Sequence, residues 1–306
     1  MKNICGLLLI VFISHCTGKA QHGQMNQDDA FSKTAPEKFT TKFEKSSLGF
    51  IFTQVILNGK KEWFLLDTGA PGLILNSSYF KASEETSGQV AGASGHAQAQ
   101  QVSVKSFNWN GIQRTDFNTM ALELSHLEKR IGRKFKGLIG MRQVKDYELM
   151  IDYEKGELTL FKKNKSQYHQ SIKPTLAIPF ELQAHIPVIK IKIGNHTYDF
   201  GIDTGAAFNL IDASAFDQIS AQAYQFDKNV PLHGADKNVP QVKQITMKDT
   251  KVAGQSFKKM TYLVNSIAHL NASPAINIGG LLGVPFLSYK QKVSISFTDH
   301  KIYFWK

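Results

Sequence analysis

The chain has 306 residues, of which 42% are hydrophobic and 20% are charged. This composition supports a packed core in one bilobal unit or two ordinary domains, and it excludes a broadly disordered protein. The formal net charge of +11 comes from scattered lysines without a nucleic-acid-binding motif, so nucleic acid is not an expected partner.

Residues 1–20 predict a secretory signal peptide. Lys2 gives a positive start, and the apolar run from Leu7 to Ile13 is too short to span a bilayer comfortably. Gly18-Lys19-Ala20 then offers small residues before a cleavage site, which would begin the mature protein at Gln21. We therefore expect a secreted or periplasmic protein. A short membrane anchor is the alternative.

The leader also leaves lipoprotein anchoring open. Ile13-Ser14-His15-Cys16 resembles a lipobox, although a histidine stands where a small residue is usual. If the leader is not a membrane anchor, only lipidation at Cys16 would place the protein on a membrane. Both cysteines, Cys5 and Cys16, lie in this leader. A mature chain from Gln21 would therefore have no disulfide, thiol nucleophile or cysteine-based metal site.

Three segments follow the leader. Residues 21–44 form a polar N-terminal segment, 45–165 a first lobe and 166–306 a second lobe. Lys162–Lys173 is polar and lysine-rich, and Pro174 follows it, which indicates a linker between the lobes.

An internal repeat defines the two lobes. In the first lobe Val55 begins an apolar stretch that leads to Asp67-Thr68-Gly69-Ala70. In the second, Ile191 precedes Asp203-Thr204-Gly205-Ala206 by the same interval. A repeat on this scale predicts two similar structural units.

The two halves match again further along the chain. Gly137-Leu138-Ile139-Gly140 corresponds to Gly280-Leu281-Leu282-Gly283, and residues 149–161 and 293–305 follow them with alternating apolar positions around a polar turn. Such alternation predicts strands in hairpins. Only 122–131 and 213–224 suit short helices, so the fold class is mainly β.

One Asp-Thr-Gly could be plain turn chemistry, but two at equivalent positions point to a shared function. The pattern resembles the pepsin and retropepsin group of aspartic proteases, and within it the bacterial aspartyl proteases with two fused lobes. Ala70 and Ala206, after each triplet, are similar to the retropepsin pattern. The resemblance implies an all-β acid protease fold with two pseudo-twofold-related retropepsin-like β-barrel lobes.

Two neighbouring carboxylates suit peptide hydrolysis without a covalent intermediate. Because both cannot ionise easily, they share one proton: the ionised member activates a water, and the protonated member supplies a proton to the carbonyl oxygen. By the resemblance, Asp67 and Asp203 are the catalytic pair. The sequence leaves open which is acid and which is base, and the pair would titrate as a unit.

The resemblance also implies supporting roles around this pair. The threonine of each triplet would hydrogen-bond across the pseudo-twofold axis, and the glycine would let the loop turn its N–H groups toward the carboxylates. The glycine that closes each apolar-apolar-Gly motif would pack beneath the loops. These residues are Thr68, Gly69, Gly140, Thr204, Gly205 and Gly283.

A flap is expected over the catalytic pair. Residues 91–97 are glycine-rich and resemble the flap tip of this family, with Gly92, Ser94 and Gly95 as substrate-binding candidates. Residues 232–236, with Gly234, are the second-lobe equivalent, for which a flexible surface turn is the alternative. Neither segment carries the tyrosine of pepsin flaps, so pepsin-like subsites are not implied.

Other chemistries lack their motifs. The 10 histidines show no metal-ligand spacing, and there is no Gly-x-Ser-x-Gly elbow or glycine-rich phosphate loop, so we expect no metal and no cofactor. His96 and His233 stand alone in loops, where a histidine is ordinarily solvated.

The leading hypothesis is a monomeric aspartic endopeptidase that acts on peptides or unfolded protein. The alternative is a catalytically weak, protease-like module that captures extended peptides by main-chain pairing. A third hypothesis pairs each lobe with its counterpart in a second chain, although a linker of this length makes pairing within one chain simpler. Subsite preference, pH optimum and removal of a propeptide are not determined by the sequence.

Overall fold

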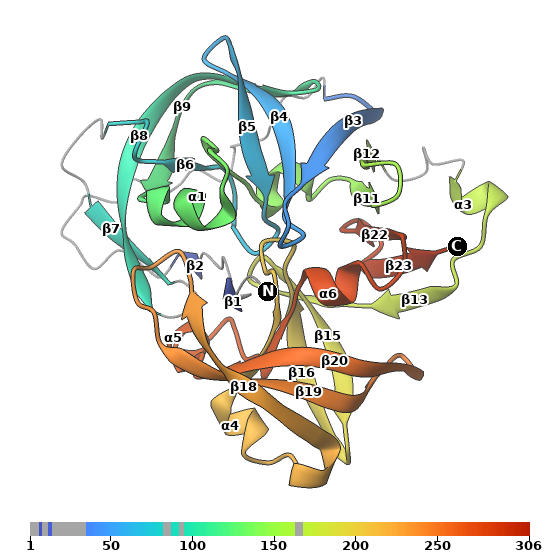
Figure 1. Cartoon of the computed structure of the whole chain (residues 1–306). Coiled ribbons are helices and arrows are strands. Elements are labelled where there is room, and N and C mark those ends of the chain that lie inside the picture. Colours follow the sequence, from blue (N-terminus) through green and yellow to red (C-terminus); the bar gives the residue numbers. More distant parts are fainter. Residues whose placement is uncertain (1–5, 8–11, 14–34, 82–86, 92–94, 163–167) are drawn as a thin grey trace.

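The computed structural model describes residues 6–7, 12–13, 35–81, 87–91, 95–162 and 168–306 of the chain. In this part strands dominate and helices are short, and the strands form two lobes with a shared sheet between them (Figure 1). The predicted all-β fold with two related β-barrel lobes is confirmed.

The first lobe is a closed six-stranded barrel in the order β4-β5-β10-β6-β9-β8, with β8 pairing back onto β4. Its strands carry buried apolar side chains, among them the fully buried Phe64, Leu75 and Trp109. The strands are β4 (Ile51–Leu57), β5 (Lys60–Leu66), β6 (Ile74–Asn76), β8 (His96–Trp109), β9 (Ile112–Leu122) and β10 (Gly137–Ile139), and β7 (Ser87–Ala91) pairs with the outer part of β8.

The second lobe repeats this barrel in the order β15-β16-β21-β17-β20-β19, and β19 closes it against β15. Phe200, Ile211 and Tyr262 are fully buried in it. The strands are β15 (Ile186–Ile193), β16 (His196–Ile202), β17 (Asn209–Asp212), β19 (Gln241–Val252), β20 (Gln255–Asn265) and β21 (Gly280–Leu282), with β18 (Tyr224–His233) beside β19 and β14 (Glu181–Gln183) beside β15.

A sheet of strands from both halves joins the lobes, in the order β13-β23-β22-β11-β12-β3. The predicted hairpins at 149–161 and 293–305 are confirmed as its β11–β12 and β22–β23 pairs. The strands are β3 (Lys38–Lys45), β11 (Glu148–Asp152), β12 (Glu157–Phe161), β13 (Leu176–Pro179), β22 (Lys292–Ser296) and β23 (Lys301–Trp305).

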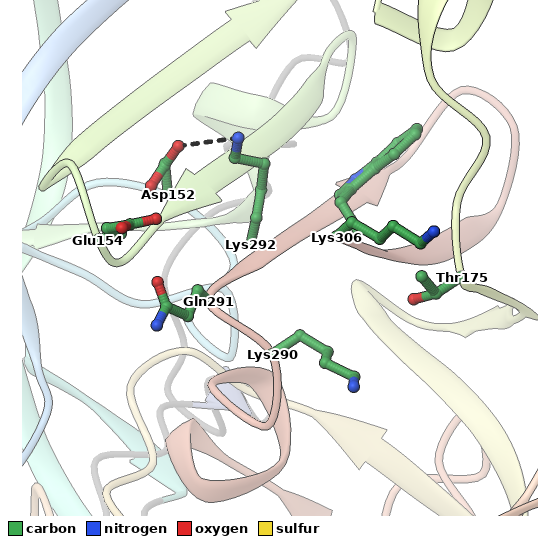
Figure 2. A pocket seen from close by; sticks show the side chains of 8 residues that line it. Asp152, Glu154, Thr175, Lys290, Gln291, Lys292 and Lys306 are labelled. Atoms are coloured by element: carbon green, nitrogen blue, oxygen red, sulfur yellow. Dashed lines mark ion pairs between the residues drawn. The ribbon is translucent and has the colours of Figure 1, made fainter.

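The seam of this sheet is the antiparallel pairing of β11 with β22. A surface pocket of ≈ 290 Å³ lies at the seam. Among the side chains that line it (Figure 2), Lys292 forms an ion pair with Asp152, with Nζ 3.0 Å from Oδ2. The pocket lies on the shared sheet and not at the Asp-Thr-Gly loops.

Most of β3 comes from the segment 21–44, which we expected to precede the first lobe. Its aromatic side chains are anchored: the ring of Phe39 lies 5.5 Å from Trp109, and that of Phe43 lies 6.2 Å from Tyr153. These contacts explain why the strand is added to the shared sheet.

The helices connect the strands. The predicted helix at 122–131 is found as α1, but the one at 213–224 is divided, because Asp212 and Ser220 each accept a backbone N–H and cap separate turns. The helices are α1 (Ser125–Ile131), α2 (Met141–Val144), α3 (Tyr168–Ser171), α4 (Ala213–Phe216), α5 (Ala268–Asn271) and α6 (Val284–Leu287), with a 3₁₀ turn at Ala221–Ala223.

Part of the predicted linker is packed against the shared sheet. In α3, His169 Nε2 lies 2.8 Å from the carboxylate of Glu148, and its ring lies 4.7 Å from Tyr303 and 4.8 Å from Trp305. The aromatic contacts and the buried carboxylate give this polar segment a defined position.

Two dipeptides of the predicted signal peptide form strands. β1 (Gly6–Leu7) pairs in parallel with β18 of the second lobe, and β2 (Phe12–Ile13) pairs antiparallel with β7 of the first. The other residues of 1–34, including Cys16 and the proposed cleavage site, lie outside the described residues. None of the helices in the described part is long and apolar enough to span a membrane.

Candidate active site

Each Asp-Thr-Gly loop begins at the end of a buried barrel strand. β10 lies parallel to β5, and the backbone N–H of Asp67 continues this ladder by donating to the carbonyl oxygen of Ile139 at 2.9 Å. In the second lobe β21 lies parallel to β16, and the N–H of Asp203 donates to Leu282 at 3.0 Å. The two repeats therefore present their loops in the same way.

The threonines join the two loops. The N–H of Thr68 donates to Oγ1 of Thr204 at 2.9 Å, and the N–H of Thr204 donates to Oγ1 of Thr68 at 3.1 Å. The hydroxyl of Thr204 also donates to the carbonyl oxygen of Leu66 at 3.0 Å. Both threonines are fully buried, so these bonds fix one lobe against the other away from water.

The glycines of the loops allow close approach to the opposite aspartate. A Cβ on Gly69 would lie 2.7 Å from Cγ of Asp203, and one on Gly205 would lie 2.4 Å from Cγ of Asp67. No larger residue fits at either position without moving a carboxylate. The structure therefore brings both triplets together in one site.

The closing glycines lie directly beneath the loops. A Cβ on Gly140 would be 2.5 Å from the carbonyl oxygen of Ala70, and one on Gly283 would be 2.2 Å from that of Ala206. The same carbonyl oxygens accept the first N–H groups of α2 and α6, each at 2.8 Å. The first turns of α2 and α6 are thus hydrogen-bonded to the two Asp-Thr-Gly loops and fix their positions.

The aspartates differ in their hydrogen bonds. Oδ1 of Asp203 accepts the N–H of Gly69 at 3.1 Å and that of Gly205 at 2.7 Å, whereas Oδ1 of Asp67 accepts the N–H of Ala70 at 3.1 Å. Both side chains are fully buried, and neither Oδ2 has a hydrogen-bond partner within the described part of the chain. The two Oδ2 atoms are therefore the ones available for chemistry.

Burial raises the pKa of both carboxyl groups because it disfavours their charged forms. The pKa of Asp67 lies well above its ordinary value through burial and then through the negative charge of Asp203. Burial raises the pKa of Asp203 to about 6, and the proton on Asp67 and the N–H groups of Gly205 and Gly69 limit that rise. Two backbone N–H groups stabilise the charge of Asp203 and one stabilises that of Asp67, which favours Asp203 as the ionised member of the pair.

The predicted flap coincides with a hairpin of β7 and β8. The tip residues Gly92 and Ser94 lie outside the described residues. Gly95 is described, and a Cβ on it would lie 2.6 Å from Nδ2 of Asn238 in the second lobe. The turn of this hairpin, at Gly95, therefore lies against the connection between β18 and β19.

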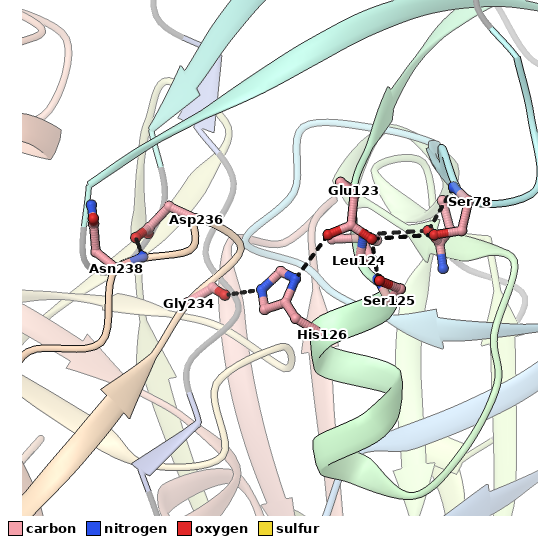
Figure 3. Close-up of polar contacts among 9 residues, drawn as sticks. Ser78, Glu123, Leu124, Ser125, His126, Gly234, Asp236 and Asn238 are labelled. Carbon is pink, nitrogen blue, oxygen red and sulfur yellow. Dashed lines mark hydrogen bonds and ion pairs between the residues drawn. The ribbon is translucent and has the colours of Figure 1, made fainter.

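The second-lobe loop is bound to α1 of the first lobe (Figure 3). Nε2 of His126 lies 3.0 Å from the carbonyl oxygen of Gly234, and its Nδ1 lies 3.4 Å from Glu123. One helix turn later, Arg130 contacts His233. Gly234 is thus held in an inter-lobe contact that its sequence neighbourhood did not reveal.

His233 is not the solvated loop histidine that the sequence suggested. Its side chain is half-buried, and burial together with the charge of Arg130 and the neighbouring His126 lowers its pKa to about 4. The described residues contain no group of three or more histidine, aspartate or glutamate side chains placed to hold a metal ion.

The sequence also missed His185. Its Nε2 lies 2.8 Å from the carbonyl oxygen of Gly69, so a side chain of the second lobe reaches the active-site loop of the first. The only hint in the sequence is a break in the repeat, because Gly49 stands at the equivalent distance before Asp67.

Two barrels that meet at paired Asp-Thr-Gly loops define an aspartic protease fold. The profile of the aspartyl protease family matches residues 53–142 and 189–286, and the chain belongs to this family. The predicted resemblance is thereby confirmed.

Solved structures show the same fold. The crystal structure of an aspartic proteinase from Irpex lacteus is similar with a TM-score of 0.54, covering 87% of this chain and 96% of that chain at 13% identity. A search of curated proteins finds no match.

Proposed function

We propose that this protein is a secreted aspartic endopeptidase that hydrolyses peptide bonds with a water molecule activated by Asp67 and Asp203. The observation that carries the proposal is the pairing of two buried carboxyl groups whose Oδ1 atoms are fixed by backbone N–H groups and whose Oδ2 atoms have no partner in the described residues. Membership of the aspartyl protease family supports it.

The asymmetry of the hydrogen bonds supports one distribution of roles. Ionised Asp203 accepts a proton from water as the water oxygen bonds to the peptide carbonyl carbon, and Asp67 gives its proton to the carbonyl oxygen. The resulting diol then breaks its C–N bond. Asp203 passes its proton to the leaving nitrogen, and Asp67 regains a proton from one diol hydroxyl, which restores the starting state.

The strand edges around the site suit an extended peptide. β7 of the first lobe and β18 of the second each pair with a short extended segment, β2 and β1 respectively. Main-chain pairing of this kind binds peptides with little dependence on their sequence. It supports peptides and unfolded protein as the substrate class.

Secretion and a monomeric state complete the proposal. The leader 1–20 supports export, with lipid anchoring at Cys16 as the variant form. The inter-lobe bonds of Thr68 and Thr204 lie within one chain, which supports a single site per monomer.

The test compares the full chain and the chain from Gln21 on a mixed peptide library at pH 4 and pH 7, with products identified by mass spectrometry. Asp67→Asn and Asp203→Asn should each abolish cleavage. Asp116→Asn is the matched control, because Asp116 is exposed on β9 and its positive φ of 49° suits asparagine. The control should cleave like the native chain.

Loss of activity in only one of the two dyad variants would contradict a shared-proton mechanism. If the native chain binds peptides but cleaves none at either pH, the peptide-binding module would replace the proposal. Neither the family nor the fold favours that alternative. Cleavage that is faster without residues 1–20 would indicate that the leader competes with substrate for β7 and β18.

A further inference from the structure

His185 begins a hydrogen-bond chain that ends on Asp67. Its Nε2 lies 2.8 Å from the carbonyl oxygen of Gly69. The same peptide group carries the N–H of Ala70, which donates to Oδ1 of Asp67 at 3.1 Å. A carbonyl oxygen can only accept, so Nε2 carries the hydrogen and the imidazole is the donor.

We propose that His185 is a positioning residue for the dyad: it holds and polarises the peptide group between Gly69 and Ala70 and thereby stabilises the ionised form of Asp67. A bond donated to the oxygen of a peptide group strengthens the bond that its N–H donates. A stronger bond to a carboxylate in turn favours the charged form of that carboxylate. The catalytic meaning of this role rests on the proposed function, but the hydrogen-bond chain does not.

Only the second lobe supplies such a histidine. The position equivalent to His185 in the first lobe is Gly49, which has no side chain to donate. Gly49 has a φ of 91°, and a Cβ on it would lie 2.7 Å from Cγ1 of Val284, so a side chain is excluded there. His185 therefore acts on Asp67 alone, and by favouring its ionised form it brings the higher pKa of Asp67 closer to that of Asp203.

The surroundings favour the neutral form of the imidazole. Burial lowers the pKa of His185, and the positive charge of Arg142 on α2 lowers it further, whereas the bond to Gly69 acts in the opposite direction. The charge of Arg142 acts on His185, and the charge of Asp203 acts on Asp67. Protonation at low pH would keep the hydrogen on Nε2, so the bond persists across the titration of the dyad.

The test uses three variants of the full chain. His185→Leu removes the donor, and His185→Gln places an amide nitrogen near the position of Nε2. His185→Asn is the matched control, because its shorter amide reaches only the position of Nδ1. Each protein carries ¹³C-labelled aspartate, and the Asp67 carboxyl resonance, assigned with Asp67→Asn, is followed against pH beside the pH profile of kcat/KM.

We expect His185→Leu and His185→Asn to raise the higher apparent pKa of the dyad by roughly half a pH unit and to move the alkaline limb of kcat/KM upward with it. His185→Gln should restore both values. An unchanged Asp67 titration in His185→Leu, or no rescue by His185→Gln, would overturn the proposal, even if thermal stability falls. If the native chain cleaves no peptide, the proposed function fails, but the carboxyl titration still decides the role of His185.

Discussion

The hydroxyl oxygen of Thr204 lies 2.9 Å from the backbone nitrogen of Thr68, a residue of the opposite lobe, and the reciprocal bond measures 3.1 Å. These bonds connect the two repeats directly behind the carboxylates. They make the position of each aspartate depend on the other lobe.

Removing the Thr204 hydroxyl should weaken this connection. Thr204→Val keeps the shape but loses the acceptor for the Thr68 N–H and the donor to Leu66, leaving buried groups unsatisfied, so we expect a loss of about 1–3 kcal/mol in unfolding free energy. Urea unfolding measures this change. Thr204→Ser should retain most of the stability, and equal losses in both variants would show that packing and not the hydroxyl is responsible.

The dyad should destabilise the fold as pH rises. Burial raises the pKa of Asp203 from 3.8 to about 6, so between these values the folded state holds a proton that the unfolded state has released, and stability falls with rising pH. Asp203→Asn has no such proton to lose. We expect it to be more stable than the native chain at pH 7 by on the order of 1–3 kcal/mol and similar near pH 4.

Thermal unfolding of Asp203→Asn at both pH values, beside Asp116→Asn, tests this expectation. An Asp203 variant that is less stable than the native chain at pH 7 would show that its hydrogen bonds outweigh the cost of burying the charge.

His233 should act in the opposite direction over the same range. Its folded-state pKa of about 4 lies below the ordinary 6.5. As the pH falls from 6.5 to 4, His233 therefore binds a proton in the unfolded state but not in the folded state, and the folded state loses stability. His233→Asn should therefore lose less stability between pH 7 and pH 4 than the native chain does. The exposed His196→Asn is the control, and identical pH dependence in all three proteins would contradict the assignment.

Gly140 should not tolerate a side chain. A Cβ there would lie 2.4 Å from the carbonyl oxygen of Gly72 and 2.5 Å from that of Ala70, so Gly140→Ala must displace the loop of Asp67. We expect about 1–3 kcal/mol of lost stability and a lower kcat. Gly72→Ala is the matched control, since its Cβ would meet Arg142 Cβ at an ordinary 3.6 Å. Similar damage in both variants would point to a general sensitivity of the loop.

The parts of the site that repeat along the chain could be predicted from sequence. Asp67 and Asp203 occupy equivalent places, and the alternation at 149–161 and 293–305 is a local property, so the hairpins of the shared sheet followed from it. The same pattern does not show that β3 joins that sheet. Its place depends on contacts of Phe39 and Phe43 with residues distant in sequence.

The histidine contacts between the lobes, unlike those of Thr68 and Thr204, could not be predicted in this way. The bonds of His185 to Gly69 and of His126 to Gly234 each join residues far apart in the chain, and neither histidine lies in a motif. A lone histidine has no periodic neighbour to mark it. Only the folded arrangement shows that both reach across to the other lobe.

The seam of the shared sheet has a consequence for how the molecule could arise. β11 and β22 pair antiparallel so that their middle residues, Met150 and Ser294, face each other, as the same strand from two identical subunits would across a twofold axis. One half-length ancestor could thus assemble an entire site by self-association. In such a dimer every mutation appears on both sides of the axis at once. Duplication within one gene removes that constraint. The joined chain can therefore have His185 in one repeat and Gly49 at the equivalent position of the other, which a dimer of identical subunits cannot.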